Sequence, residues 1–239
     1  MDSYITELKN LFSKENFKEK KDIRSAIEKA YADMSRRAQG HTFEMKEDIV
    51  NWLIKDVFNT PFDFKSQEDF NNWHKEICLE LKKHHNNFDS KFGKIGRSQK
   101  VINMSFKYLA CVDNTYNNVL PYCHMTLDSY TLNWFKSINK DFKNIKWSTI
   151  DDYEQYAFIQ EKIRKHLDNK AIYSIKIGTE KTSGLELPCS PFEAEYIIWE
   201  GEKINNKYNS LLKEINNYKN CGKEKDKWLI GSLFDKFLG

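Results

Sequence analysis

KKDIRSAIEKAYADMSRRA, residues 20–38, and EDIVNWLIKDVFN, residues 47–59, decide the fold class of this chain. In the first stretch apolar side chains recur three or four residues apart, at Ile23, Ile27, Ala30, Tyr31 and Met34. Because an α-helix turns once every ~3.6 residues, this spacing puts them on one helical face. The second stretch repeats the pattern, so both predict amphipathic helices.

Further stretches carry the same periodicity. SQEDFNNWHKEICLELKKHH, residues 66–85, has Ser66 as an expected N-cap with Asp69 in the reciprocal position. A helix over 97–111 follows, and another is expected from near Thr126 to about Lys136. Helices are also predicted over 148–169, after the SPFE cap at 190–193, and in DKWLIGSLFDKFL at 226–238.

Strand patterns are confined to AIYSIKIGTEKTSGLELP, residues 171–188, where Gly178 and Gly184 can frame a hairpin. A two-stranded hairpin is marginal alone, so we expect it to lean on the helices. The sequence therefore predicts a mainly α, multi-helix globular domain with at most one small β-hairpin near 171–187. We predict a single domain over 1–239, with a soft loop at 113–121.

Composition limits the classes of function. The 38 basic and 35 acidic residues give a net charge of +3 and a pI near 8.4, which permits a nucleic-acid partner without predicting a broad basic surface. Five widely spaced cysteines without a C-x-x-C pair indicate reduced thiols and a cytoplasmic setting. The polar amino-terminal MDSYITELKNLF and the short apolar runs predict no secretory signal and no membrane span. No Cys/His spacing typical of zinc and no nucleotide-binding glycine loop is present, so we predict neither metal nor cofactor.

The predicted helix over 97–111 is the candidate nucleic-acid element. On a helical wheel Arg97, Lys100, Asn103 and Lys107 share one side. Two or three cations and an amide can donate hydrogen bonds to phosphate oxygens. A solvated outer face would carry the same residues, and both interpretations stay open.

Two glycines precede this helix. Gly93 and Gly96 would let the backbone approach a phosphate, whose charge suits a helix N-terminus. A glycine-containing turn without a ligand is the alternative.

The run IGRSQKVINM at 95–104, followed by LDSYTL at 127–132, resembles the core of the helix-hairpin-helix DNA glycosylases over about residues 92–135. The resemblance implies that Gly96 and Arg97 lie in a hairpin that grips DNA phosphate. It also implies that Asp128 is the catalytic Asp and Lys100 the catalytic Lys of a base-excision enzyme. The glycines are three positions apart here and two in that family.

Two functions are left open by the residues. The first is a nucleic-acid-binding protein, of a DNA glycosylase-like kind, in which Asp128 activates water at an extruded base. As a carboxylate in the first turn of a helix, Asp128 can instead serve only the helix dipole. The second is a non-enzymatic helical protein that binds another protein, for example a mobile-element or phage accessory factor, through its C-terminal helix.

Overall fold

The computed structural model describes residues 2–18, 21–36, 41–59, 61–142, 145–174, 176–177, 180–181 and 184–220. In this part of the chain the α-helices are α1 (Asp2–Asn16), α2 (Ile23–Ser35), α3 (Phe43–Trp52), α4 (Gln67–Phe88), α5 (Ile95–Leu109), α6 (Ser129–Ile138), α7 (Tyr153–Leu167) and α8 (Pro191–Asn220). Short helical turns are η1 (Leu53–Val57), η2 (Asn114–Asn118), η3 (Leu120–Tyr122) and η4 (Trp147–Thr149). The mainly α fold is confirmed.

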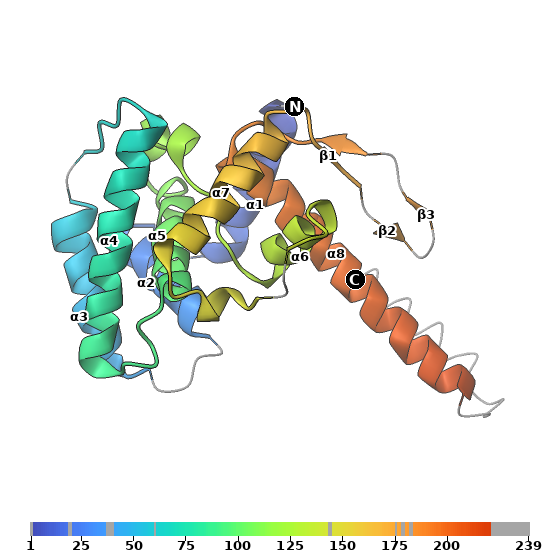
Figure 1. Ribbon diagram of the computed structural model, residues 1–239, viewed down its shortest axis with the longest axis horizontal. Helices are drawn as coiled ribbons and strands as arrows, with labels where there is room; N and C mark the ends of the chain where they lie inside the picture. The colour runs from blue at the N-terminus through green and yellow to red at the C-terminus, as the bar shows by residue number, and fades with distance from the viewer. Residues whose placement is uncertain are drawn as a thin grey trace.

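Helix α5 is central to the fold, with α2, α4, α7 and η4 packed around it (Figure 1). Its side chains are buried almost all round, which contradicts the amphipathic pattern expected with a solvated basic side. One hydrophobic core joins residues from α1 through α8. The second half of α8 projects away from this helical body (Figure 1).

Side-chain caps set several of the helix starts. Ser66 accepts a hydrogen bond from the backbone N–H of Asp69, as the sequence predicted. Helix α6 begins at Ser129, three residues later than expected, and Asp128 is its N-cap. Helix α7 begins after Asp152, because residues 147–149 form the separate turn η4.

The predicted hairpin is present. Strand β1 (Ile172–Tyr173) pairs antiparallel with β4 (Leu185–Glu186), and β2 (Lys176–Ile177) pairs antiparallel with β3 (Glu180–Lys181). The Tyr173 ring lies against Gly201 of α8, where a β-carbon would overlap it. The Tyr173 hydroxyl donates to Glu202 Oε1 at 3.2 Å, so the hairpin leans on α8 as expected.

The segment predicted as a soft loop, 113–121, is built from η2 and η3. Its Tyr116 hydroxyl donates to the Phe58 carbonyl at 3.0 Å, and Asn118 Nδ2 donates to the Phe62 carbonyl at 2.8 Å. These bonds tie it to the chain that follows η1. The C-terminal helix predicted at 226–238 lies outside the described residues, as does the protein-binding surface expected on it. None of the helices in the described part has the length and apolar composition that a membrane span requires.

Candidate functional site

A pocket of about 300 Å³ opens where the C-terminal ends of α1 and α2 meet α5, the start of α6 and α8. We call it the Lys100 pocket. Its charged lining residues are Glu15, Asp33, Arg36, Lys100, Lys107 and Asp128. Its aromatic lining residues are Phe12, Tyr108, Tyr130, Trp147 and Trp199. Three of the predicted site residues, Lys100, Lys107 and Asp128, thus lie around one cavity.

Lys100 lies on the wall of this pocket at the middle of α5. Its Nζ is 4.6 Å from the centroid of the Trp147 ring, a cation–π contact. Burial lowers the pKa of Lys100, and the nearby carboxylates of Asp128 and Asp33 oppose that shift. A buried lysine of this kind carries a larger neutral fraction than a lysine in water, and a neutral amine is a nucleophile.

Asp128 faces the same pocket from the start of α6. Its Oδ1 accepts hydrogen bonds from the backbone N–H groups of Tyr130, at 2.9 Å, and Thr131, at 3.1 Å. The Thr131 hydroxyl accepts the Asp128 N–H at 2.9 Å, which completes a capping box. These contacts hold Oδ1 and leave Oδ2 without a hydrogen bond among the described residues. Asp128 is therefore a helix cap whose second carboxylate oxygen, Oδ2, can accept a hydrogen bond or a proton from a ligand.

The extended segment before Asp128 is held by side chains that replace a neighbouring strand. Gln160 of α7 bonds both the N–H and the carbonyl of Met125, at 3.2 and 2.7 Å. Gln99 of α5 does the same for Leu127, at 3.1 and 2.9 Å. Because each amide satisfies one donor and one acceptor, the buried backbone is fixed in place.

Glu195 of α8 completes this support. Its Oε2 accepts the Thr126 N–H at 2.7 Å, and its Oε1 pairs with Lys107 Nζ at 2.9 Å. The sequence interpretation did not single out Gln99, Gln160 or Glu195. A usable signal existed at Gln160, which occupies a position on the apolar stripe of α7, where an unpaired amide would be costly.

Lys107 is not available for phosphate, in contrast to the prediction. Both Lys107 and Glu195 have side chains only 3% exposed. The rings of Tyr196, Phe12 and Trp199 surround Lys107 Nζ at 4.4, 4.9 and 5.6 Å. Glu195 already neutralises the charge of Lys107, which would be far more costly to bury without a partner.

Asn103 is also enclosed, on the side of α5 toward α4 and α7. Its Oδ1 lies 3.0 Å from His74 Nε2, and its Nδ2 donates to Gln99 Oε1 at 3.1 Å and to the Tyr156 hydroxyl at 3.0 Å. All of its hydrogen-bonding atoms are engaged inside the protein. The expected phosphate contact of Asn103 has no support in this geometry.

This buried set continues through His124, whose Nδ1 lies 2.9 Å from the Tyr156 hydroxyl and whose Nε2 lies 2.9 Å from Asn71 Oδ1. Tyr156 accepts from Asn103, so its own proton goes to His124 Nδ1. His124 then donates from Nε2. His74 follows the same rule, since it donates from Nε2 to Asn103 and accepts at Nδ1 from Tyr153, 2.9 Å away. We call this set the polar network; it consists of Asn71, His74, Gln99, Asn103, His124, Tyr153 and Tyr156.

Burial lowers the pKa of His74 to about 3 and that of His124 well below its usual value. Both rings are therefore neutral, as their hydrogen bonds require.

Arg97 points away from the Lys100 pocket. Its guanidinium carbon is 4.0 Å from the centroid of the Phe92 ring, near His85. Arg97 does not line the cavity that Asp128 lines. Its proposed contact with phosphate stays a prediction.

The two glycines serve close packing. The Gly96 N–H donates to the Ile150 carbonyl at 2.8 Å, and a β-carbon at Gly96 would overlap the carbonyl oxygen of Trp147. A β-carbon at Gly93 would overlap the side chain of Asn86. The expected hairpin grip on phosphate is not supported at Gly96, because its amide already has a partner.

The described residues contain no group of three or more His, Cys, Asp or Glu side chains placed to hold a metal ion. Comparison with known proteins gives no relative for this chain: no family model, no curated sequence and no solved structure matches it.

Proposed function

We propose that this protein binds nucleic acid and takes a nucleobase, or the sugar that carried it, into the Lys100 pocket. The observation that carries the proposal is that Lys100 and Asp128 line the same aromatic cavity. A volume of about 300 Å³ is at the lower end of the ~300–1,000 Å³ range of small-ligand sites. Aromatic walls suit a flat base, because extruded bases stack between such side chains.

The chemistry that fits best is addition of an amine to a sugar aldehyde. Lys100 Nζ would add to the aldehyde carbon of an opened abasic sugar, and the carbonyl oxygen would leave as water, giving an imine. Asp128 Oδ2 would take and return the protons of these steps. Lys100 is the nucleophile in this scheme and Asp128 the acid–base group.

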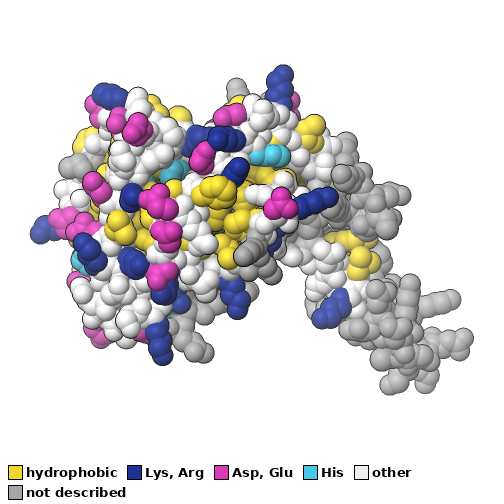
Figure 2. Space-filling model, in the orientation of Figure 1, with side chains coloured by type: hydrophobic (Ala, Val, Ile, Leu, Met, Phe, Trp, Pro, Cys, Tyr) yellow, Lys and Arg dark blue, Asp and Glu magenta, His cyan; other side chains and the backbone are white. Residues whose placement is uncertain are grey.

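The affinity for nucleic acid would come from this local site. Figure 2 shows Lys and Arg side chains interspersed with Asp and Glu over the face in view, around apolar surface. With a net charge of +3 the chain offers a modest overall attraction for phosphate. We therefore expect binding that favours a damaged or unstacked base over intact duplex.

Borohydride trapping tests the proposal. The protein is mixed with a duplex that contains one abasic site, and borohydride reduces any imine to a stable secondary amine. Mass spectrometry of the digested adduct then locates the modified lysine. We expect the adduct on Lys100, its loss in Lys100→Met, and a lower yield in Asp128→Asn, which keeps a good N-cap.

Lys55→Met is the matched control, since Lys55 is an exposed lysine outside the pocket. It should trap as the wild type does. An adduct spread over several surface lysines, or an equal yield in Lys100→Met, would overturn the assignment. Absence of salt-dependent binding to this duplex and to single-stranded DNA would end the nucleic-acid proposal.

A further inference from the structure

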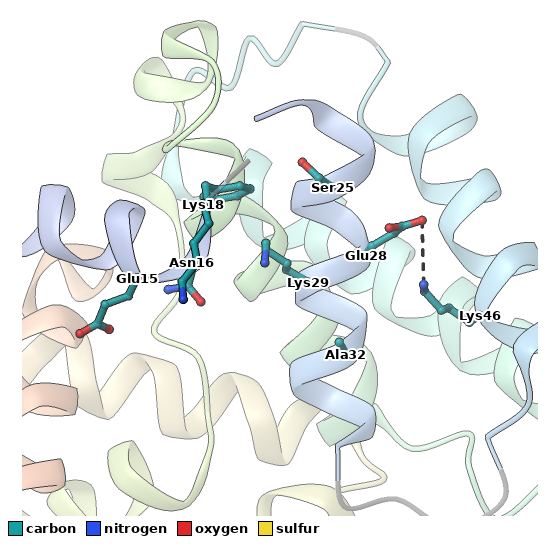
Figure 3. Close-up of a pocket in the computed structure, with 9 residues that line it drawn as sticks. Glu15, Asn16, Lys18, Ser25, Glu28, Lys29, Ala32 and Lys46 are labelled. Carbon is teal, nitrogen blue, oxygen red and sulfur yellow. Dashed lines mark ion pairs between the residues drawn. The ribbon is translucent and has the colours of Figure 1, made fainter. Parts of the chain in front are cut away.

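A second hollow adjoins the Lys100 pocket. It is a groove of about 670 Å³ between the end of α1 and the outer side of α2, with Lys46 of α3 at its far edge (Figure 3). We call it the α1–α2 groove. Glu15 and Asn16 line both the groove and the Lys100 pocket, so the two spaces meet at the C-terminal end of α1.

The residue at this junction is held in place. Asn16 Nδ2 donates to the Phe12 carbonyl at 2.8 Å. Asn16 Oδ1 lies 3.4 Å from the Tyr108 hydroxyl, which donates its proton to Asp33 Oδ2 at 2.6 Å. Phe12 and Tyr108 are themselves lining residues of the Lys100 pocket. A ligand that crosses from one space to the other would therefore pass over a fixed edge.

The charges in the groove are unequally matched. Glu28 pairs with Arg24 at 3.2 Å and with Lys46 at 3.9 Å, so its charge is used within the protein. Lys18 and Lys29 have no carboxylate partner within 4.0 Å among the described residues, and Lys29 Nζ lies 5.4 Å from the Phe17 ring centroid. Glu15 is the remaining acid, at the junction. Two ammonium groups are thus open to an anion from outside.

We infer that the α1–α2 groove binds the phosphates next to the base held in the Lys100 pocket, with Lys18 and Lys29 as the phosphate contacts. This inference rests on the proposed function and extends it to the path of the strand. The ligand class is a flexible single strand, because its backbone can turn from an open groove into an enclosed pocket. Helix α2, with 13 residues at ~1.5 Å each, is roughly 20 Å long and can accompany more than one phosphate.

The salt dependence of binding separates this path from the pocket itself. A fluorescein-labelled oligothymidylate is titrated with protein between about 50 and 200 mM salt. Each phosphate contact on a single strand contributes a slope of about 0.7 in log K against log salt. The double variant Lys18→Gln/Lys29→Gln should therefore lower the slope by about 1.4. Binding of free thymidine, which has no phosphate, should not change.

A control variant, Lys83→Gln/Lys162→Gln, removes two exposed lysines from α4 and α7 that line neither space. Its slope should equal that of the wild type. An unchanged slope in Lys18→Gln/Lys29→Gln, with the wild type still binding both probes, would overturn the groove assignment and leave the proposed function standing. Failure of the wild type to bind either probe would overturn both.

Discussion

Helix α5 buries polar side chains on two sides. The two sides differ in whether every polar atom has a hydrogen-bond partner inside the protein. Toward α4 and α7, the polar network closes on itself, and each ring nitrogen and amide of His74, His124 and Asn103 has an internal partner. Toward α1 and α8, Lys100 and Asp128 line an open cavity, and the Oδ2 of Asp128 has no hydrogen bond among the described residues.

The difference distinguishes polar residues that hold the fold together from polar residues that could bind or react with a ligand. A closed network specifies how helices pack, because any other arrangement would leave costly unpaired groups. It offers nothing to a ligand. A partly bonded lysine and carboxylate beside a cavity are the pattern expected where a ligand supplies the missing partners. Polar residues on a central helix therefore need to be judged by their unused atoms and not by their type.

The largest effect on stability is expected at Lys107. This residue lines the Lys100 pocket, but its ammonium group is already paired inside the protein, as the groups of the polar network are. Lys107→Met leaves Glu195 buried without its cation, and removal of one partner from a buried pair typically costs about 3–5 kcal/mol. We expect a loss of that size in the free energy of unfolding, measured by urea denaturation. The double variant Lys107→Met/Glu195→Gln removes the charge and keeps an acceptor for the Thr126 N–H, so it should recover most of the loss. A cost below about 1 kcal/mol for Lys107→Met would show that the pair is solvated.

A change in stability of intermediate size is expected when the pH is lowered, because several buried histidines are neutral in the folded protein. Burial lowers the pKa of His85, like that of His74, to about 3. A folded-state pKa below the unfolded value of about 6.5 means that the unfolded chain binds protons first. Stability from each ring is therefore complete above pH 6.5 and is lost as the pH falls toward 3. By pH 5 this amounts to about 2 kcal/mol per ring.

His85 permits a clean measurement of this effect. Neither of its ring nitrogens has a hydrogen-bond partner among the described residues, and its ring packs 5.2 Å from that of Phe92. His85→Phe should therefore retain wild-type stability near neutral pH and lose about 2 kcal/mol less than the wild type between pH 7 and pH 5. His41→Gln, at an exposed position, should follow the wild-type curve. A steeper pH dependence in His85→Phe would contradict the assignment of a neutral ring.

The sequence predicted the elements better than their surroundings. Apolar periodicity and the Ser66 cap identified α2 and α4, because both effects are local to the helix. The same periodicity was misleading for α5, since Lys107 and Asn103 read as a solvated side when their partners, Glu195 and His74, are far away in the chain. Lys100 and Asp128, both named as site residues from the sequence, do line one pocket. Arg97 lies over Phe92, outside that pocket, which the sequence could not show because a helical wheel does not tell which neighbouring helix covers each side.

The smallest expected change in stability is at Lys100, and it sharpens the comparison most. A methionine of similar length keeps the packing over Trp147 and removes a charge that burial already disfavours, so Lys100→Met should change the free energy of unfolding by less than about 1.5 kcal/mol. Urea denaturation of Lys100→Met and Lys107→Met under the same conditions gives the contrast directly. Two lysines seven residues apart on α5 would then differ severalfold in how much their replacement lowers the free energy of unfolding. Lys100, whose replacement costs less, would be the residue that borohydride trapping requires. If Lys100→Met costs as much as Lys107→Met, the Lys100 ammonium is an internal structural contact, and the pocket side of α5 is no more available to a ligand than the polar network.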